Sequence, residues 1–191
     1  MENQLGKSNI CLITGSFEGG GAERLMVLLA NYYSKFNKNT TIACLKKFGP
    51  NKNLLSEDIT IYNLNCKITY SILGFIKLLK NKRRFTHIIV AYYSLIFPII
   101  ISSLFLRYKS KIVICESNPL SVVRLGLPGF LLGVITRAIC YRFVHKIVAN
   151  SEDTKLSITR FSFLNKANIQ VVPNPVIDSS LHYVLKKSIN I

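Results

Sequence analysis

The chain has 191 residues, 49% of them hydrophobic, which is enough apolar material for a folded domain with its own core. Twenty-five lysines and arginines against nine acidic residues give a net charge of +16, which favours polyanions or anionic lipid as partners. Five scattered cysteines, with no Cys-x-x-Cys pair and no histidine at metal-ligand spacing, argue against a disulfide framework and against a metal site. Residues 1–7 lack the apolar core of a signal peptide, so we expect a cytoplasmic protein.

Apolar runs of strand length alternate with stretches of helical periodicity along the chain. Leu25, Leu28, Leu29, Tyr32 and Phe36 recur at helical spacing and mark the first helix. Further helices are predicted at 71–82, at 99–108 and from 151 onward, and strands at 9–14, 40–45, 59–62, 87–91, 111–115, 146–150 and 169–172. This alternation predicts an α/β fold with a doubly wound, mainly parallel, Rossmann-like sheet.

The longest uncharged run, residues 88–106, permits two interpretations. Its length would allow it to span a bilayer. Tyr92, Tyr93 and Pro98 interrupt it, however, and a strand, a turn and a helix with proline near its first turn explain the same pattern. We favour the second interpretation because it continues the alternation seen elsewhere.

Three consecutive glycines, Gly19, Gly20 and Gly21, lie between the first strand and the first helix. Backbone N–H groups can converge there without obstruction by Cβ atoms, and the positive end of the helix dipole points at the same place. The turn is therefore a candidate site for a diphosphate. A tight turn without a ligand is the alternative. A P-loop is excluded because Gly21-Ala22 stands where Lys-Ser/Thr is needed, and the pattern for NAD binding is also missing.

In a parallel sheet of this kind, the loops after the strands share one edge, where ligands bind. The glycine turn, Tyr92-Tyr93, residues 116–119 and Asn150-Ser151 are predicted to meet there. Glu116 directly follows a strand and is the only acidic residue between Asp58 and Glu152. It is a candidate catalytic base or hydroxyl-positioning group. The alternative is that its carboxylate caps backbone N–H groups of a loop.

Four segments together resemble a known family: Gly20-Gly-Ala-Glu-Arg24 running into an apolar helix, Cys115-Glu-Ser-Asn-Pro119, Val148-Ala-Asn-Ser-Glu152 and Val172-Pro-Asn-Pro-Val176. In this order they are similar to the N-terminal domain of retaining, nucleotide-sugar-dependent GT-B glycosyltransferases of family 4, also called group 1. Many members of that family build bacterial surface polysaccharides or lipid-linked oligosaccharides. The resemblance covers residues 10–178.

The resemblance implies roles for individual residues. Gly19, Gly20 and Gly21 would approach the donor diphosphate, and Glu116 matches an acidic position of the family, although Cys115 replaces a serine and the loop is one residue shorter. Residues implied at the acceptor site or the interdomain cleft are Tyr93, Ser117, Asn118, Asn150 and Ser151. The co-substrate would be a nucleoside-diphosphate sugar and the acceptor a saccharide or a lipid-linked saccharide, with no organic cofactor and no metal.

Residues 1–178 would form the acceptor-side domain and residues 179–191 the start of a linker. The donor-binding domain of the family has no counterpart in this sequence. We expect the chain alone to transfer no sugar. Three alternatives stay open: the chain is a fragment of a longer protein, it is the product of a truncated gene, or a separate chain supplies the second half.

The stretch 122–146 mixes apolar residues with Arg124, Arg137 and Arg142. Such a helix can lie on an anionic membrane with these arginines at the lipid phosphates, which would place the protein at the inner face of the plasma membrane. The alternative is a core helix with a solvated basic face. Two rival functions remain, a noncatalytic subunit that tethers a donor-binding chain to the membrane and a nucleic-acid-binding module. The sequence has no recognition motif for nucleic acid, so none is expected as a partner.

Overall fold

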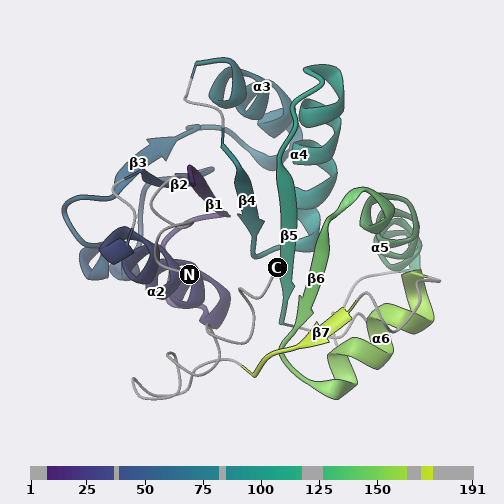
Figure 1. The fold of residues 1–191 in the computed structure, drawn as a ribbon. Coiled ribbons are helices and arrows are strands. Elements are labelled where there is room, and N and C mark those ends of the chain that lie inside the picture. The colour runs from purple at the N-terminus through teal and green to yellow at the C-terminus, as the bar shows by residue number, and fades with distance from the viewer. Residues whose placement is uncertain (1–7, 37–38, 82–84, 118–126, 163–168, 174–191) are drawn as a thin grey trace. The chain divides into compact units, whose positions relative to one another are not determined.

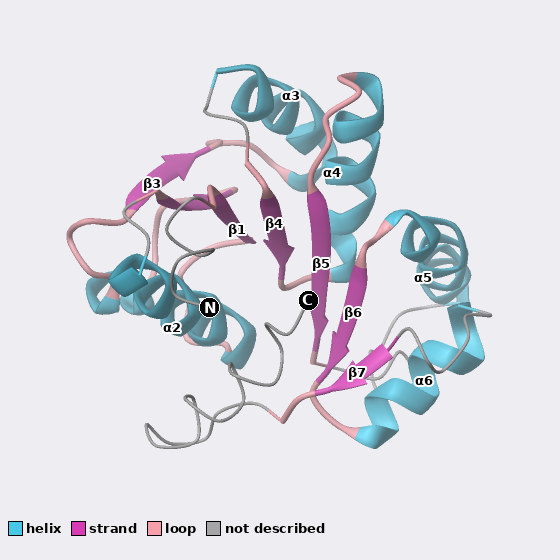
Figure 2. Ribbon diagram, viewed as in Figure 1, coloured by secondary structure: helices cyan, strands magenta, loops and turns pink. Residues whose placement is uncertain are grey.

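A computed structural model describes residues 8–36, 39–81, 85–117, 127–162 and 169–173 of the chain. Strands and helices alternate throughout these residues (Figure 1; Figure 2). The strands are β1 (Ile10–Thr14), β2 (Thr40–Cys44), β3 (Thr60–Asn63), β4 (His87–Val90), β5 (Lys111–Glu116), β6 (Lys146–Ala149) and β7 (Ile169–Val171). The α-helices are α2 (Gly21–Phe36), α3 (Ser71–Asn81), α4 (Tyr93–Phe105), α5 (Leu127–Cys140) and α6 (Glu152–Ser162), with short 3₁₀ turns η1 (Pro50–Leu54), η2 (Ile68–Tyr70) and η4 (Tyr141–Phe143).

The strands follow the order β3-β2-β1-β4-β5-β6-β7 in one sheet. The pairings of β1 with β2, β1 with β4, β2 with β3 and β6 with β7 are all parallel. The predicted α/β, doubly wound fold is therefore confirmed. The chain divides into two compact units, residues 1–113 and 114–191, and the boundary falls within β5. The predicted extent of a single domain, 1–178, stays a prediction.

In the first unit, β1 and β2 are buried along their whole length, as their continuous apolar runs predict. Helix α2 packs on these two strands through Met26, Val27, Ala30 and Tyr33. The stripe predicted from the sequence lies to one side of this face, because Leu25, Leu28, Tyr32 and Phe36 are only partly buried. A helix that begins at Gly21 has so many apolar positions that spacing alone did not fix its inward face.

The uncharged run 88–106 is divided between β4 and α4. Helix α4 begins at Tyr93, six residues earlier than predicted, and Pro98 lies inside it rather than in its first turn. No helix in the described part of the chain is both long enough and apolar enough to cross a membrane. The interpretation as strand, turn and helix is confirmed.

The second unit contains β6, β7, α5 and α6, together with the end of β5. Ser151 precedes α6, and its hydroxyl accepts a hydrogen bond from the backbone N–H of Thr154 at 3.2 Å. Glu152 and Asp153 occupy the first turn of α6, where the helix dipole favours negative charge. Helix α5 packs against α6, with Phe130 and Phe161 in edge-to-face contact.

Candidate functional site

The glycine turn lies between β1 and α2, as predicted. Gly19, Gly20 and Gly21 are all exposed, and Gly21 is the first residue of the helix. The carbonyl of Gly20 accepts the backbone N–H of Arg24 at 3.0 Å, which closes the first helical turn. The free N–H groups of this first turn point out of the helix end, where the dipole is positive.

The segment that leads into the turn is held by the loop after β2. The N–H of Phe17 donates to the carbonyl of Phe48 at 2.8 Å, and the N–H of Asn51 donates to the carbonyl of Phe17 at 3.0 Å. The side-chain amide of the buried Asn51 also donates to the carbonyl of Glu18. Gly49 permits this close approach, because it has φ 121° and a Cβ there would lie 2.2 Å from the backbone of Phe17. These contacts hold the segment that precedes the glycine turn in place.

The glycines themselves are not required by the packing of the chain. A Cβ added to Gly19 or Gly21 would meet nothing within 4 Å, and none of the three glycines has the left-handed φ that favours glycine. At Gly20 a Cβ would lie 2.1 Å from the carboxylate of Glu23, which folds back over it. This open space leaves room for a ligand beside the first turn of α2, where free N–H groups favour an anion. An anion site at Gly19 and Gly21 stays a prediction.

Polar side chains gather beside the turn within the first unit. The phenol of Tyr92, the last residue before α4, hydrogen-bonds to Glu23. Burial raises the pKa of Tyr92, and the hydrogen bond and the negative charges of Glu23 and Glu18 raise it further. The structure thus brings Tyr92 to the glycine turn, because β1 and β4 are paired neighbours. The predicted site residue is the next one, Tyr93, which begins α4 and whose side chain lies outside the described residues.

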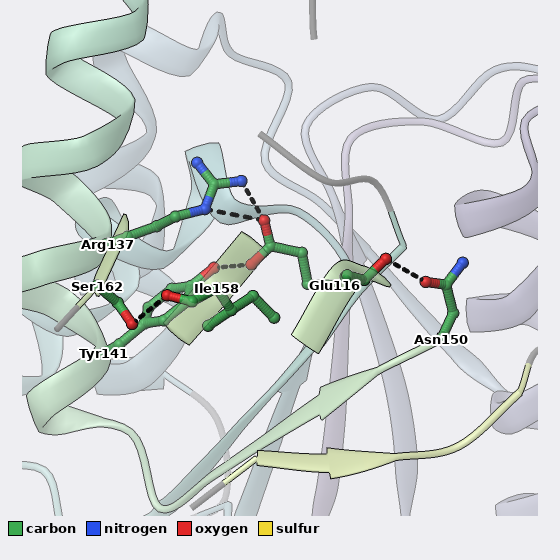
Figure 3. Close-up of polar contacts among 7 residues, drawn as sticks. Glu116, Arg137, Tyr141, Asn150, Ile158 and Ser162 are labelled. Atoms are coloured by element: carbon green, nitrogen blue, oxygen red, sulfur yellow. Dashed lines mark hydrogen bonds and ion pairs between the residues drawn. The ribbon is translucent and has the colours of Figure 1, made fainter. Parts of the chain in front are cut away.

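The carboxylate of Glu116 lies inside the second unit, only 4% exposed. Its Oε1 accepts hydrogen bonds from Arg137, with Nε at 2.9 Å and Nη2 closer, and its Oε2 accepts one from the hydroxyl of Tyr141 (Figure 3). Arg137 is itself only 1% exposed. Burial raises the pKa of Tyr141 well above its usual range, and the negative charge of Glu116 raises it further.

These contacts bear on two predictions. The expectation that Arg137 lies at a membrane surface is wrong, because its guanidinium is buried and paired with Glu116. The outward side chains of α5 are instead apolar, namely Leu131, Ile135 and Ile139. The described hydrogen bonds of the Glu116 carboxylate come from side chains, and not from the backbone N–H groups that the capping alternative predicts. A catalytic role for Glu116 stays a prediction.

Asn150 and Ser151 follow β6 and are tied to the end of β5. The backbone N–H of Asn150 donates to the carbonyl of Glu116 at 3.2 Å, so the structure brings these two predicted site residues together. The side-chain oxygen of Asn150 accepts the hydroxyl of Thr154 at 2.7 Å, and Ser151 caps α6. Both side chains therefore stabilise the start of α6.

The remaining predicted site residues have the following positions. Ser117 is half-buried directly after β5, and Arg142 is exposed in η4. Asn118 and Arg124 lie outside the described residues. Within the described ranges, no three histidine, cysteine or acidic side chains come together as metal ligands. The common edge that would unite the glycine turn with Glu116 stays a prediction.

Comparison with solved structures shows what the fold is similar to. The chain matches Anabaena HepE, solved with UDP and glucose, with a TM-score of 0.67 over 96% of this chain and 50% of HepE, at 16% identity. HepE solved with UDP-glucose gives a TM-score of 0.68 over 94% of this chain. The lipopolysaccharide outer core galactosyltransferase WaaB matches with a TM-score of 0.65 over 89% of this chain and 47% of WaaB, at 17% identity.

No protein-family model matches the sequence, and no curated protein matches it with statistical significance. The chain spans about half the length of the solved structures it matches. At this level of identity the comparison establishes the fold, one Rossmann-like half of a GT-B architecture, which is the fold expected from the sequence resemblance.

Proposed function

We propose that this chain is the acceptor-binding half of a nucleotide-sugar-dependent glycosyltransferase of the retaining, family 4 type. The structural match to HepE and WaaB over nearly the whole of this chain, and only half of theirs, carries the proposal. The open glycine turn supports it independently, because its geometry suits a diphosphate and the packing of the chain gives no other reason for glycine at 19 and 21.

In this proposal the donor is a nucleoside-diphosphate sugar, with a uridine nucleotide as the first candidate because HepE was solved with UDP and with UDP-glucose. Gly19 and Gly21 offer N–H groups to the diphosphate. Glu23 sits over Gly20 and limits access from that side. A second half, in the same polypeptide or in another chain, supplies the remaining donor contacts.

Ser117, Asn118, Asn150, Ser151 and Tyr93 are assigned to the acceptor side of the cleft. For Glu116, the two buried partners favour a positioning role: it fixes the end of β5, whose carbonyl binds Asn150. The acceptor is a saccharide or lipid-linked saccharide for a bacterial surface polymer, at the cytoplasmic face of the plasma membrane. The net charge of +16 supports contact with an anionic membrane.

A transfer assay tests this proposal. Radiolabelled UDP-sugars and other nucleotide sugars are incubated with lipid-linked acceptors and with the chain alone, with the chain plus any sequence that follows Ile191 in the reading frame, and with separate donor-binding chains. We expect transfer only when a donor-binding half is present. Transfer by residues 1–191 alone would refute the assignment as one half, and failure of every combination would refute the glycosyltransferase function.

A further inference from the structure

The outer faces of α3 and α4, in the first unit, expose large apolar side chains. Phe105 is 72% exposed, Leu73 68% and Tyr70 64%. We call the following group the α3–α4 patch: Tyr70, Leu73, Phe97, Ile101, Leu104 and Phe105. Clusters of exposed apolar side chains on this scale usually mark an interaction surface.

The members of the patch lie on one surface. Phe97, Ile101, Leu104 and Phe105 fall within about 100° of the circumference of α4, as expected for one helical stripe. The hydroxyl of Ser102 donates to the carbonyl of Ile72 at 3.1 Å, so the end of α4 lies against the start of α3, where Leu73 is found. Figure 1 shows the two helices side by side.

The surroundings of the patch are positively charged. Residues 59–115, which include α3 and α4, contain nine lysines and arginines and no aspartate or glutamate. Lys67, Lys77, Lys80, Arg107 and Lys109 are all exposed next to the two helices in sequence. A second copy of the chain would bring two such cationic faces together and is therefore disfavoured.

An anionic surface with an apolar interior fits both features. Basic side chains attract lipid phosphates, while leucine, isoleucine and phenylalanine enter the boundary of the acyl chains. Nucleic acid would satisfy the charge but offers no counterpart for the aliphatic side chains. Helix α4, with 13 residues, is about 20 Å long, so it can lie on a bilayer but cannot cross its core of about 30 Å.

We propose that the α3–α4 patch is the surface by which this protein binds an anionic membrane, in place of the arginines of residues 122–146. This surface serves the membrane contact and lipid-linked acceptor of the proposed function. Helix α4 begins at Tyr93, directly after the Tyr92 that bonds to Glu23 at the glycine turn. The glycine turn thus lies near the first residue of α4, whereas Leu104 and Phe105 of the patch lie in the last turn of the helix.

Vesicle flotation with paired variants tests the proposal. The complete chain is mixed with vesicles of phosphatidylglycerol and phosphatidylcholine, or of phosphatidylcholine alone, at low and high salt. The variant Leu73→Ser/Phe105→Ser removes apolar surface from the patch without changing charge. The control Leu131→Ser/Ile139→Ser changes side chains of α5 that are 51% and 55% exposed. Circular dichroism and thermal unfolding confirm that both variants are folded.

We expect binding only to the anionic vesicles, weakened by salt. Leu73→Ser/Phe105→Ser should lower the partition coefficient by at least about tenfold, and the α5 variant by less than about twofold. Equal losses in both variants, or a loss only in the α5 variant, would overturn the proposal. So would binding to an RNA or DNA oligonucleotide in preference to vesicles. No vesicle binding by the unmodified chain would overturn it as well and leave the transfer assay, which can use a detergent-dispersed acceptor, as a separate test of function.

Discussion

The guanidinium of Arg137 binds the carboxylate of Glu116 inside the second unit, with Nε 2.9 Å from Oε1 and with both side chains less than 5% exposed. Two opposite charges buried together in this way are tolerated because each satisfies the other, and Tyr141 supplies a third hydrogen-bonding group. The pair connects the end of β5 to α5, so its loss should destabilise the whole unit.

Removal of Arg137 should therefore destabilise the protein strongly. We expect Arg137→Ala to lower the free energy of unfolding by about 3–5 kcal/mol, because it leaves the Glu116 carboxylate buried without its counter-charge. The double variant Glu116→Leu/Arg137→Met should recover most of this loss, since it removes both charges and keeps the volume filled. Urea unfolding measures both values.

Arg142→Ala is the matched control for that experiment, because Arg142 is an exposed arginine of the same unit. It should change the free energy of unfolding by less than about 0.5 kcal/mol. Suppose that Glu116→Leu/Arg137→Met is stable but inactive in the complete transferase, and that other substitutions in β5 leave the enzyme active. Glu116 then acts in the reaction as well as in the fold. Equal stability losses for Arg137→Ala and Arg142→Ala would contradict the buried pair.

The phenol of Tyr141 should make stability depend on pH in the alkaline range. Its pKa is raised in the folded protein, whereas an unfolded tyrosine ionises near pH 10. Above about pH 10 the unfolded state therefore holds fewer protons, and the free energy of unfolding falls as the pH rises; below that pH the contribution is complete. Tyr141→Phe should flatten this dependence.

At neutral pH, Tyr141→Phe should cost about 1.5–3 kcal/mol, the range for a hydrogen bond to a charged group. Tyr70→Phe, at a position that is 64% exposed, should cost less than about 0.5 kcal/mol. Urea unfolding at several pH values gives both the cost and the slope. An unchanged alkaline slope in Tyr141→Phe would show that another group is responsible.

Gly49 should be needed to hold the segment before the glycine turn. Gly49→Ala puts a Cβ into the backbone of Phe17 and places alanine at φ 121°, so we expect a loss of at least about 1–3 kcal/mol. Gly15→Ala is the control, because its Cβ meets nothing within 4 Å. Hydrogen exchange of the Phe17 and Asn51 amides should accelerate in the first variant only. Similar exchange in both would disprove the restraint.

Gly19 and Gly21 should matter for ligand binding and little for stability. Gly19→Val and Gly21→Val place branched side chains in the open space at the turn. In the complete transferase we expect affinity for the nucleotide sugar to fall by at least about tenfold, and the free energy of unfolding to change by less than about 1 kcal/mol. Isothermal titration and urea unfolding measure the two effects. Thr69→Val, an exposed change in the same unit, should alter neither; unchanged affinity in the glycine variants would exclude this turn from the donor site.

The elements of the fold could largely be predicted from sequence because buried parallel strands are continuous apolar runs bounded by polar turns. The start of α4 could not. The position of Pro98 in the sequence suggests the first turn of a helix, yet Pro98 lies about one and a half turns inside α4. Burial of the apolar residues of the run 88–106 stabilises the helix although proline cannot donate a backbone hydrogen bond. The inward face of α2 was also misplaced, since apolar residues cover more than half of its circumference.

The candidate site was predicted less completely. The glycine turn and the Glu116–Asn150 contact follow from strand order, which a sequence with clear alternation discloses. The partners of the two carboxylates do not follow, because Arg137 lies 21 residues from Glu116 and Tyr92 lies 69 residues from Glu23, on different elements. A lone arginine in an apolar stretch was the available signal. That signal fits an exposed charge as well as it fits a charge buried against Glu116.

Arg137 also determines the orientation of α5 about its own axis. Ile135 and Ile139 lie about 160° from Arg137 around an ideal helix, so drawing the guanidinium inward turns these isoleucines outward. Rotation of α5 to bury the isoleucines would move the Arg137 guanidinium into solvent and leave the Glu116 carboxylate buried without a counter-charge. The apolar outer side of α5 is thus the geometric result of one internal charge pair, and no separate attraction to lipid is needed to explain it.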